Sequence, residues 1–314
     1  MQYRRLGQAG MKVSAIALGG WINFGEGKVA QDTAREVVRT AYEQGINFYD
    51  LADTYAKGAA EEHMGALLSE YPRHTLVVST KVFWPISQDI NDRGLSRKHI
   101  MESIDGSLRR LGMDYVDMYF CHRPDPETPI LETARAMDDL VHSGKVLYWG
   151  TSEWSADSIR ETWDLCERYG LYPPQVEQPH YSMLHRRIVE NEILPVAQPR
   201  GMGLVVFSPL GMGMLTGKYD DGIPADSRFG REDWAARRYV NDENLARVRQ
   251  LKPIAEELGI SRAQLALAWT LRQPGVSSAI IGATRPSQIN DNAAAAEVVL
   301  PPDVIDRIDQ ILNS

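Results

Sequence analysis

The chain has 314 residues, of which 43% are hydrophobic and 24% charged, a composition that is typical of soluble globular proteins. Its net charge of −8 and its scattered basic residues argue against nucleic-acid binding. It has only two cysteines, without a CxxC pair, and no apolar run long enough for a signal-peptide core or a membrane span. We therefore expect a cytoplasmic protein without disulfides or membrane insertion.

The chain begins with a predicted β-hairpin and continues with eight apolar runs that predict β-strands. Residues 1–14 form two short extended runs around a glycine-containing turn, and we expect this hairpin to cover the bottom of the fold. The eight runs are residues 13–19, 46–50, 75–82, 115–121, 145–152, 174–178, 203–211 and 277–283. Stretches with apolar residues at helical spacing separate them, so strands and helices alternate along the chain.

Several predicted helices have recognisable ends. Ser96 is the expected N-cap of a helix whose apolar stripe ends at Gly112. The stretch 129–144 follows the same pattern and also ends at a glycine. The interval between the last two strands is too long for one loop and one helix. It predicts a long loop and an additional helix over 242–259, broken or kinked at Pro253.

Eight strand–helix pairs have two common solutions, an open doubly wound sheet and a closed (β/α)8 barrel. The glycine-rich stretch after the first strand, GGWINFGEG, lacks the GxGxxG spacing of the doubly wound dinucleotide folds. No linker or shift in composition divides the chain. We predict an α/β protein in which residues 1–314 form one domain, a TIM barrel with an N-terminal β-hairpin and extra C-terminal helices.

Polar residues follow several predicted strands, and the carboxyl ends of barrel strands are where such folds build their sites. These residues are Asp50, Tyr55, Lys81, His122, Ser152, Gln178 and Ser208. Because an unpaired buried ammonium is costly, we expect Asp50 to pair with Lys81. Lys81 beside Tyr55 would favour the phenolate and lower the tyrosine pKa, and His122 could hydrogen-bond a substrate oxygen. A purely structural Asp50–Lys81 ion pair is the alternative interpretation.

The motifs GINFYDLADTY, VVSTK and YFCHRP resemble the aldo-keto reductase family, whose Asp, Tyr, Lys and His tetrad lies on the ends of barrel strands. GLSRKHI, RPDPETPILETARAM, YWGTSEWS and GVSSAIIGA resemble the branch that includes the beta subunits of voltage-gated potassium channels and their bacterial relatives. The resemblance implies an NADPH-dependent enzyme that reduces aldehydes and ketones to alcohols. In it Tyr55 is the general acid, Asp50 holds Lys81, Lys81 tunes Tyr55, and His122 orients the carbonyl.

The same resemblance implies positions that bind NADPH. They are Trp21, Asp50, Ser152, Gln178, Phe207, Ser208, Pro209, Leu210, Gly211, Gly213, Lys218, Arg228, Gly282, Thr284, Arg285, Gln288 and Asn292. By this match, Ser152 and Gln178 hold the nicotinamide carboxamide and Phe207 stacks on the ring. The glycine-containing loop 208–213 surrounds the pyrophosphate, and residues 282–292 match the adenosine end, with Arg285 available for the 2′-phosphate.

The chain departs from the family pattern at two positions and keeps it at a third, where the channel subunits differ. Glu153 follows Ser152 where many members have Asn and the channel subunits have Arg. Gln288 stands where many reductases have Arg, which shifts the 2′-phosphate onto Arg285, Lys218 or Arg228. Channel subunits usually have Asn at the position of His122, so the complete tetrad favours a working reductase.

Two other functions stay open at this point. The first is an NADPH-binding, redox-sensing subunit that regulates a membrane channel or transporter, although we expect the barrel to begin close to Met1 without an extension that could plug a pore. The second is an unrelated barrel lyase or isomerase. The expected partner is a small carbonyl substrate, and a homo-oligomer is an alternative that the resemblance to tetramer-forming channel subunits leaves open.

Other side chains have simpler interpretations. We interpret Cys121 as a packing residue, Asp53 as a loop residue without a role, His99 as solvated and residues 234–238 as a solvated segment. His180 and His185 are expected in a loop, and no cysteine or carboxylate pattern there supports a metal site. The loops expected to define the substrate are residues 23–30, 83–94 and 219–241. The aromatic residues that could shape its pocket are Trp84, Trp154, Tyr181 and Trp234.

Overall fold

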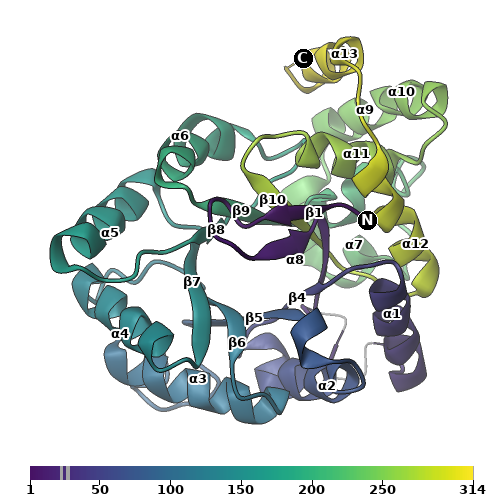
Figure 1. The fold of residues 1–314 in the computed structure, drawn as a ribbon. Helices are drawn as coiled ribbons and strands as arrows, with labels where there is room; N and C mark the ends of the chain where they lie inside the picture. The colour runs from purple at the N-terminus through teal and green to yellow at the C-terminus, as the bar shows by residue number, and fades with distance from the viewer. Residues whose placement is uncertain (22–23, 26–28, 314) are drawn as a thin grey trace.

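Eight parallel strands close into a barrel at the centre of the molecule, with helices around it (Figure 1). The computed structural model describes residues 1–21, 24–25 and 29–313. Within these, the barrel strands are β3 (Ile16–Gly19), β4 (Phe48–Asp50), β5 (Val77–Val82), β6 (Val116–Cys121), β7 (Val146–Ser152), β8 (Val176–Gln178), β9 (Gly203–Phe207) and β10 (Val276–Ile281). They follow chain order around the barrel, and β10 pairs with β3 to close it. The predicted TIM barrel is therefore confirmed.

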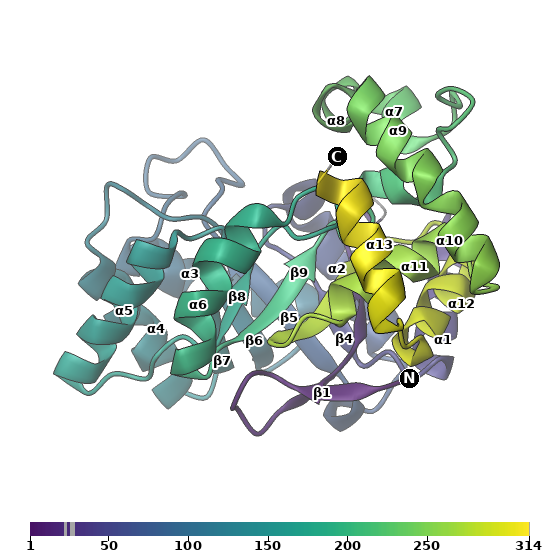
Figure 2. The same ribbon diagram turned by 90° about the horizontal axis from the view of Figure 1, so that it is seen from above.

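The predicted N-terminal hairpin consists of β1 (Tyr3–Arg5) and β2 (Lys12–Ser14), so the first predicted strand is divided between β2 and β3. Leu6 is fully buried among side chains of the barrel interior. At Gly7, which has φ +58°, an added Cβ would lie 2.1 Å from the carbonyl oxygen of Gly201, just before β9. The hairpin therefore presses on the amino end of the barrel, opposite to the helices α7 (Arg228–Arg231) and α8 (Asp233–Tyr239) (Figure 2).

Helices surround the barrel in the part of the chain that the structure describes. They are α1 (Gln31–Glu43), α2 (Ala59–Leu68), α3 (Arg97–Leu111), α4 (Ile130–His142), α5 (Ala156–Tyr169), α6 (Leu194–Ala197), α11 (Arg262–Leu271) and α12 (Pro286–Ala294). In α3, the Ser96 side chain accepts a hydrogen bond from the amide of His99, Ile100 and Ile104 are buried, and Gly112 ends the helix at φ +65°. The predicted ends of this helix are confirmed.

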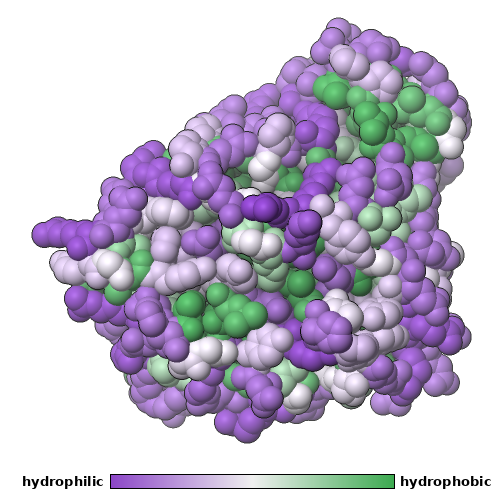
Figure 3. All heavy atoms as spheres, in the orientation of Figure 1, coloured by the Kyte–Doolittle hydropathy of each residue, from purple (hydrophilic) through white to green (hydrophobic). Residues whose placement is uncertain are grey.

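Additional helices occupy the connection from β9 to β10 and the end of the chain. They are α7, α8, α9 (Asp242–Gln250), α10 (Lys252–Glu257) and α13 (Pro302–Asn313). The break predicted within 242–259 is confirmed, because α9 stops at Gln250 and α10 starts again just before Pro253. Seen from the hairpin side, the surface is mostly hydrophilic, with one apolar patch over the region of these C-terminal helices and another over the region of β6 and β7 (Figure 3).

The remaining helical turns are short. The 3-10 turns are η1 (Tyr55–Gly58), η2 (Arg73–Thr75), η4 (Gln198–Arg200), η5 (Gly211–Thr216) and η6 (Ala295–Glu297), and η3 (Val189–Ile193) is a π turn. Residues 234–238, interpreted as a solvated segment, lie in α8, where Ala235 is fully buried and Tyr239 nearly so. Trp234, Arg237 and Arg238 are exposed, so the segment is largely solvated, as interpreted. It forms a short helix rather than a loop, because tertiary contacts bury one of its faces.

Alternate side chains of a barrel strand point into the barrel interior and outward to the helices, because side chains of a β-strand have a two-residue period. On β6, Met118 and Phe120 fill the barrel interior, whereas Tyr119 and Cys121 belong to the layer between strands and helices. Cys121 is fully buried, and burial raises the pKa of its thiol above the ordinary value. Its interpretation as a packing residue is confirmed. The next inward-facing position on this period is His122.

Candidate active site

The inward-facing positions of the strands continue from apolar residues into polar ones at the carboxyl end of the barrel. Phe48 on β4 belongs to the apolar interior, and two residues later Asp50 lines a cavity. On β8, Val176 is followed by Gln178 in the same way. The other residues that continue this layer are Lys81, His122, Ser152, Phe207 and Gly282. The two-residue period thus places side chains from separate strands in one layer at the barrel mouth.

Lys81 is the centre of the polar layer. Its side chain is fully buried, and its Nζ donates to Asp50 Oδ2 at 2.7 Å, to the carbonyl oxygen of Leu51 at 2.6 Å and to the Tyr55 hydroxyl at 3.3 Å. Asp50 Oδ1 also accepts hydrogen bonds from Ser79 Oγ at 2.7 Å and Gln178 Nε2 at 3.0 Å. The predicted Asp50–Lys81 pair is present, and the same ammonium reaches the tyrosine.

Tyr55 lies in η1, just beyond the end of β4, and its ring stands edge-on to His122 with 5.9 Å between the ring centroids. Burial raises the pKa of the Tyr55 hydroxyl, and Lys81 opposes this without reversing it. The expected lowering of the tyrosine pKa was therefore wrong as a net direction, because burial outweighs the nearby ammonium. At neutral pH the hydroxyl keeps its proton and is available as a donor.

His122 is a neutral imidazole in this layer. Burial holds its pKa well below the ordinary value, and the positive charges of Lys81 and Arg123 lower it further. Its Nδ1 is buried and has no hydrogen-bond partner among the residues that the structure describes. The ring therefore adds a neutral hydrogen-bonding group beside the Tyr55 hydroxyl.

A cavity of about 1250 Å³ opens above these residues and extends toward β9 and β10. Asp50, Tyr55 and His122 line it, whereas Lys81 lies behind them. The predicted cofactor positions on its wall are Trp21, Ser152, Gln178, Phe207, Ser208, Pro209, Leu210, Gly213, Lys218, Arg228, Gly282, Thr284, Arg285, Gln288 and Asn292. Gly211, by contrast, is buried and does not line it.

The cavity end near β9 suits phosphate groups. Ser208 at φ +51° and Gly213 at φ +99° turn the backbone sharply, and a Cβ on Gly213 would lie 2.9 Å from the ammonium nitrogen of Lys218. Glycine there leaves room for close backbone approach to a ligand, with a cation beside it. Arg228 and Arg285 add positive charge to the wall. The donors and cations of this wall fit the pyrophosphate and 2′-phosphate of a dinucleotide.

At the end of the cavity near β10, Gln288 is held by hydrogen bonds within the wall. Gln288 Oε1 accepts from the backbone amide of Thr284 at 2.8 Å and lies 3.2 Å from its hydroxyl. The side-chain amide of Gln288 carries no charge, so Arg285 and the cations near β9 supply the positive charge of the wall. The departure at position 288 thus leaves a neutral group where many family members have a cation.

Glu153 and His180, which the sequence left without a role, meet behind Phe207. Glu153 has φ +59°, and its Oε1 accepts a hydrogen bond from the backbone amide of His180 at 2.7 Å. The His180 ring stacks on Phe207 at 5.1 Å and on His185 at 4.1 Å between centroids. His185 reaches His180 through the local turn between Ser182 and His185. Phe207 reaches it only through the pairing of β8 with β9, which no local pattern could have indicated.

Arg123 is a cavity residue that sequence reasoning missed. The available signal was its place directly after His122, at the end of a barrel strand. Residues 23 and 26–28 of the predicted substrate loop 23–30 lie outside the described residues. Of the four aromatic residues proposed for the pocket, Trp84 lines the cavity, whereas Trp154 and Tyr181 are buried elsewhere. Trp234 lies 5.9 Å from Trp21, between ring centroids.

Asp53 lies in a loop, as interpreted, whereas the interpretation of His99 as solvated was wrong. Asp53 is fully buried, accepts a hydrogen bond from Ser103 Oγ at 2.7 Å, and has its pKa raised to about 7 by burial. It lies outside the cavity wall. His99 is also buried, with Nδ1 2.9 Å from the carbonyl oxygen of Gly94 and Nε2 3.2 Å from Asp92. Both side chains connect loops to α3: Asp53 lies in a loop and bonds Ser103 of the helix, and His99 of the helix contacts the loop that precedes it.

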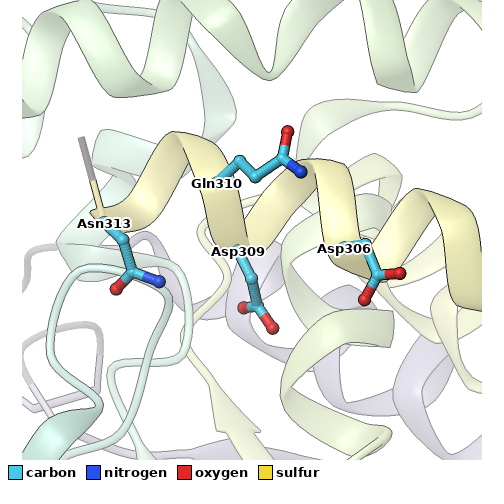
Figure 4. A pocket seen from close by; sticks show the side chains of 4 residues that line it. All are labelled: Asp306, Asp309, Gln310 and Asn313. Atoms are coloured by element: carbon cyan, nitrogen blue, oxygen red, sulfur yellow. The ribbon is translucent and has the colours of Figure 1, made fainter.

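A second hollow, of about 530 Å³, lies against α13 and is lined by Asp306, Asp309, Gln310 and Asn313 (Figure 4). Arg186 already engages this surface, because it lies 3.3 Å from Asp309 and donates to Asn313 at 2.7 Å.

The described residues contain no group of three or more His, Cys, Asp or Glu side chains arranged for a metal ion. They also contain no helix with the length and apolar character needed to cross a membrane.

Residues 15–313 match the model of the Aldo/keto reductase family. The chain is 49% identical to the "Probable voltage-gated potassium channel subunit beta" of Arabidopsis thaliana over 321 residues, covering 100% of this chain and 97% of the relative. It is 48% identical to the protein of the same name from Oryza sativa subsp. japonica, with the same coverage. The chain belongs to the aldo/keto reductase family, whose members are NADPH-dependent enzymes. The resemblance read from the motifs is confirmed.

Proposed function

We propose that the protein reduces aldehydes and ketones to alcohols with NADPH, with Tyr55 as the general acid. One observation carries this proposal: a fully buried Lys81 pairs with Asp50 and also lies 3.3 Å from the Tyr55 hydroxyl, at the wall of a large cavity. A purely structural ion pair would not require a tyrosine on the same ammonium. Tyr55 and His122 then face the cavity as neutral hydrogen-bonding groups.

The cavity volume of about 1250 Å³ supports a dinucleotide together with a small substrate, because drug-sized ligands occupy roughly 300–1,000 Å³. Ser152, Gln178 and Phe207 would hold the nicotinamide, and Lys218 and Arg285 would face phosphates. When bound, NADPH supplies the hydride, so that R–CHO + NADPH + H⁺ gives R–CH₂OH + NADP⁺. The assigned residues that line the cavity, which are all of them except Gly211, support this cofactor.

The chain's own residues would handle the charge that develops on the carbonyl oxygen. Tyr55 Oη and the His122 ring would hydrogen-bond this oxygen, in a site that the barrel shields from water. As the carbonyl carbon is reduced, the Tyr55 hydroxyl would pass its proton to the oxygen. The ammonium of Lys81, held by Asp50, would then stabilise the phenolate that remains.

Replacing Tyr55 by Phe tests this assignment. We expect NADPH oxidation, followed by absorbance with a panel of aldehydes and ketones, to fall by about 10²–10⁴-fold, because one general acid contributes roughly that factor. Binding of NADPH, followed by fluorescence, is expected to persist. Tyr169→Phe, at an exposed tyrosine of α5, is the control and should leave the rate unchanged. Wild-type protein that oxidises no NADPH across the panel, or an unimpaired Tyr55→Phe variant, would contradict the proposal.

A second candidate function rests on the relatives at 49% and 48% identity, which are named as potassium channel beta subunits. In this case the protein would bind NADPH, sense its redox state and regulate a channel as a cytoplasmic subunit, alone or as a homo-oligomer. The presence of His122 in the tetrad favours catalysis over sensing alone. We therefore place the reductase first.

A further inference from the structure

Arg123 places a guanidinium at the substrate end of the cavity, directly after His122. Its Nη1 donates to the carbonyl oxygen of His122 and lies 3.5 Å from Ser152 Oγ. The charge reaches the reactive groups, because Arg123 lowers the pKa of His122 and contributes in the same direction at Tyr55. The guanidinium therefore acts on the place where the carbonyl oxygen would lie.

This guanidinium forms no ion pair with a carboxylate of the described residues. Both of its hydrogen bonds there start from Nη1, which leaves Nη2 and Nε available to a ligand. Lys81, by contrast, is paired with Asp50, and Arg228 has the charge of Glu232 nearby. Lys218 and Arg285 also form no ion pair with a carboxylate of the described residues, but they lie at the positions assigned to phosphates. A guanidinium matches a carboxylate with two parallel hydrogen bonds, so a free edge at a cavity wall is suited to such a group.

The anion that fits Arg123 would not belong to the cofactor. Arg123 lies beside His122 and Ser152, and Ser152 is the position assigned to the uncharged nicotinamide carboxamide. The positions assigned to phosphates lie instead on the loop after β9 and between β10 and α12, at Lys218 and Arg285. A negative charge beside Arg123 must then come with the substrate.

We propose that the preferred substrate is a carbonyl compound that carries a carboxylate, and that Arg123 binds this carboxylate while Tyr55 and His122 bind the carbonyl oxygen. Trp21 and Trp84, 37% and 41% exposed, also line the cavity and offer apolar ring faces for the body of the substrate. This inference rests on the proposed carbonyl reduction and adds the class of substrate to it.

A matched pair of aldehydes tests the inference. 4-Carboxybenzaldehyde and methyl 4-formylbenzoate share the ring and the aldehyde and differ in charge. We expect wild-type kcat/KM with NADPH to favour the carboxylate at least about tenfold, as one charge-assisted hydrogen-bonded pair allows. Arg123→Met should reduce this ratio to near one, and Arg123→Lys should keep part of it. The control Arg109→Met, at an exposed position of α3, should leave the ratio unchanged.

A wild-type ratio near one, or an Arg123→Met variant that loses both activities equally, would overturn the inference. Calorimetry separates this failure from failure of the reductase itself. We expect the NADP⁺-loaded protein to bind 4-(hydroxymethyl)benzoate at least about tenfold more tightly than its methyl ester, and Arg123→Met to remove the difference. If neither aldehyde is reduced but this preference persists, the carboxylate site stands and the reductase proposal falls. If the preference is missing, the carboxylate site falls whether or not the aldehydes are reduced.

Discussion

Lys81 links the stability of the barrel to its proposed chemistry. Burial alone would lower the pKa of its ammonium, but the Asp50 carboxylate and Tyr55 raise it above the ordinary value, so the group stays charged. Three acceptors within 3.3 Å satisfy its three donors. Removing Asp50 would leave a buried charge without its counter-ion, which is among the costliest changes in a protein interior. The pair is thus both structural and suited to tune Tyr55.

Glu177 on β8 is a second buried ionisable residue, and it gives a pH prediction. It is fully buried, and burial raises the pKa of its carboxyl to about 8. Because this pKa is raised in the folded state, the stability contribution is complete below the unfolded value, near 4.5, and is lost as the pH rises through 8. Between pH 6 and 8 we expect the unfolding free energy of the wild type to fall by about 1–2 kcal/mol more than that of Glu177→Gln, because the variant lacks the carboxyl that ionises.

Urea unfolding of both proteins at pH 6 and pH 8 measures this difference. The exposed Glu167→Gln in α5 is the matched control and should behave as wild type. Burial raises the pKa of Asp53 to about 7, so Asp53 adds a similar pH dependence of stability in both proteins. Identical pH dependence in Glu177→Gln and wild type would contradict the assignment of the raised pKa to Glu177.

At the scale of elements, α8 is fastened to the barrel through His180. The Tyr239 hydroxyl lies 2.7 Å from His180 Nε2, and Arg238 donates to His180 Nδ1 at 3.2 Å. Burial, His185 and Arg238 lower the pKa of His180 to about 3, so this ring accepts from Arg238 in its neutral form. The helix α7, which carries Arg228 into the cavity wall, directly precedes α8. We infer that this contact positions α7 against the cofactor.

Tyr239→Phe tests the contact between α8 and His180. The ring and its packing on Phe229 remain, but the hydrogen bond to His180 is lost. We expect the Kd for NADPH, measured by fluorescence titration, to rise about three- to tenfold, since one such bond is worth roughly 1 kcal/mol. The exposed Tyr3→Phe in the hairpin serves as the control. An unchanged Kd in Tyr239→Phe would show that α8 does not help to position α7.

Most elements could be predicted from sequence because their signals are local. Ser96 and Gly112 determine the ends of α3, and Pro253 separates α10 from α9, through the chemistry of one or two residues. The helix α8 could not be predicted in this way. The burial of Tyr239 depends on His180, which is 59 residues away in the chain.

The same distinction applies to the site. Asp50, Lys81 and His122 could be placed together from the strand pattern, because a two-residue period and parallel strands determine which side chains share a layer. The net pKa of Tyr55 could not be predicted, since it depends on how completely the surroundings exclude water. The burial of Asp53 and His99 likewise depends on contacts with α3 and its preceding loop, which no local pattern encodes.

At the scale of the whole molecule, the barrel separates two tasks. The hairpin covers its amino end, and α7 and α8 lie at the opposite end (Figure 2). The cavity is at this carboxyl end, and Arg228 of α7 contributes to its wall. We propose that residues 1–314 act as one domain, since strands from the whole chain contribute to this cavity. The central claim is that this site transfers hydride to a carbonyl, with a proton from Tyr55.

Isotope transfer tests this claim most directly. NADPH deuterated at the transferable position of the nicotinamide is mixed with 4-carboxybenzaldehyde, and the alcohol is analysed by mass spectrometry. We expect one deuterium in the product with wild-type protein, and transfer reduced about 10²–10⁴-fold with Tyr55→Phe at saturating NADPH. Wild-type protein that binds the labelled NADPH but gives no deuterated alcohol, with this aldehyde or with methyl 4-formylbenzoate, would contradict the account and favour a sensing subunit.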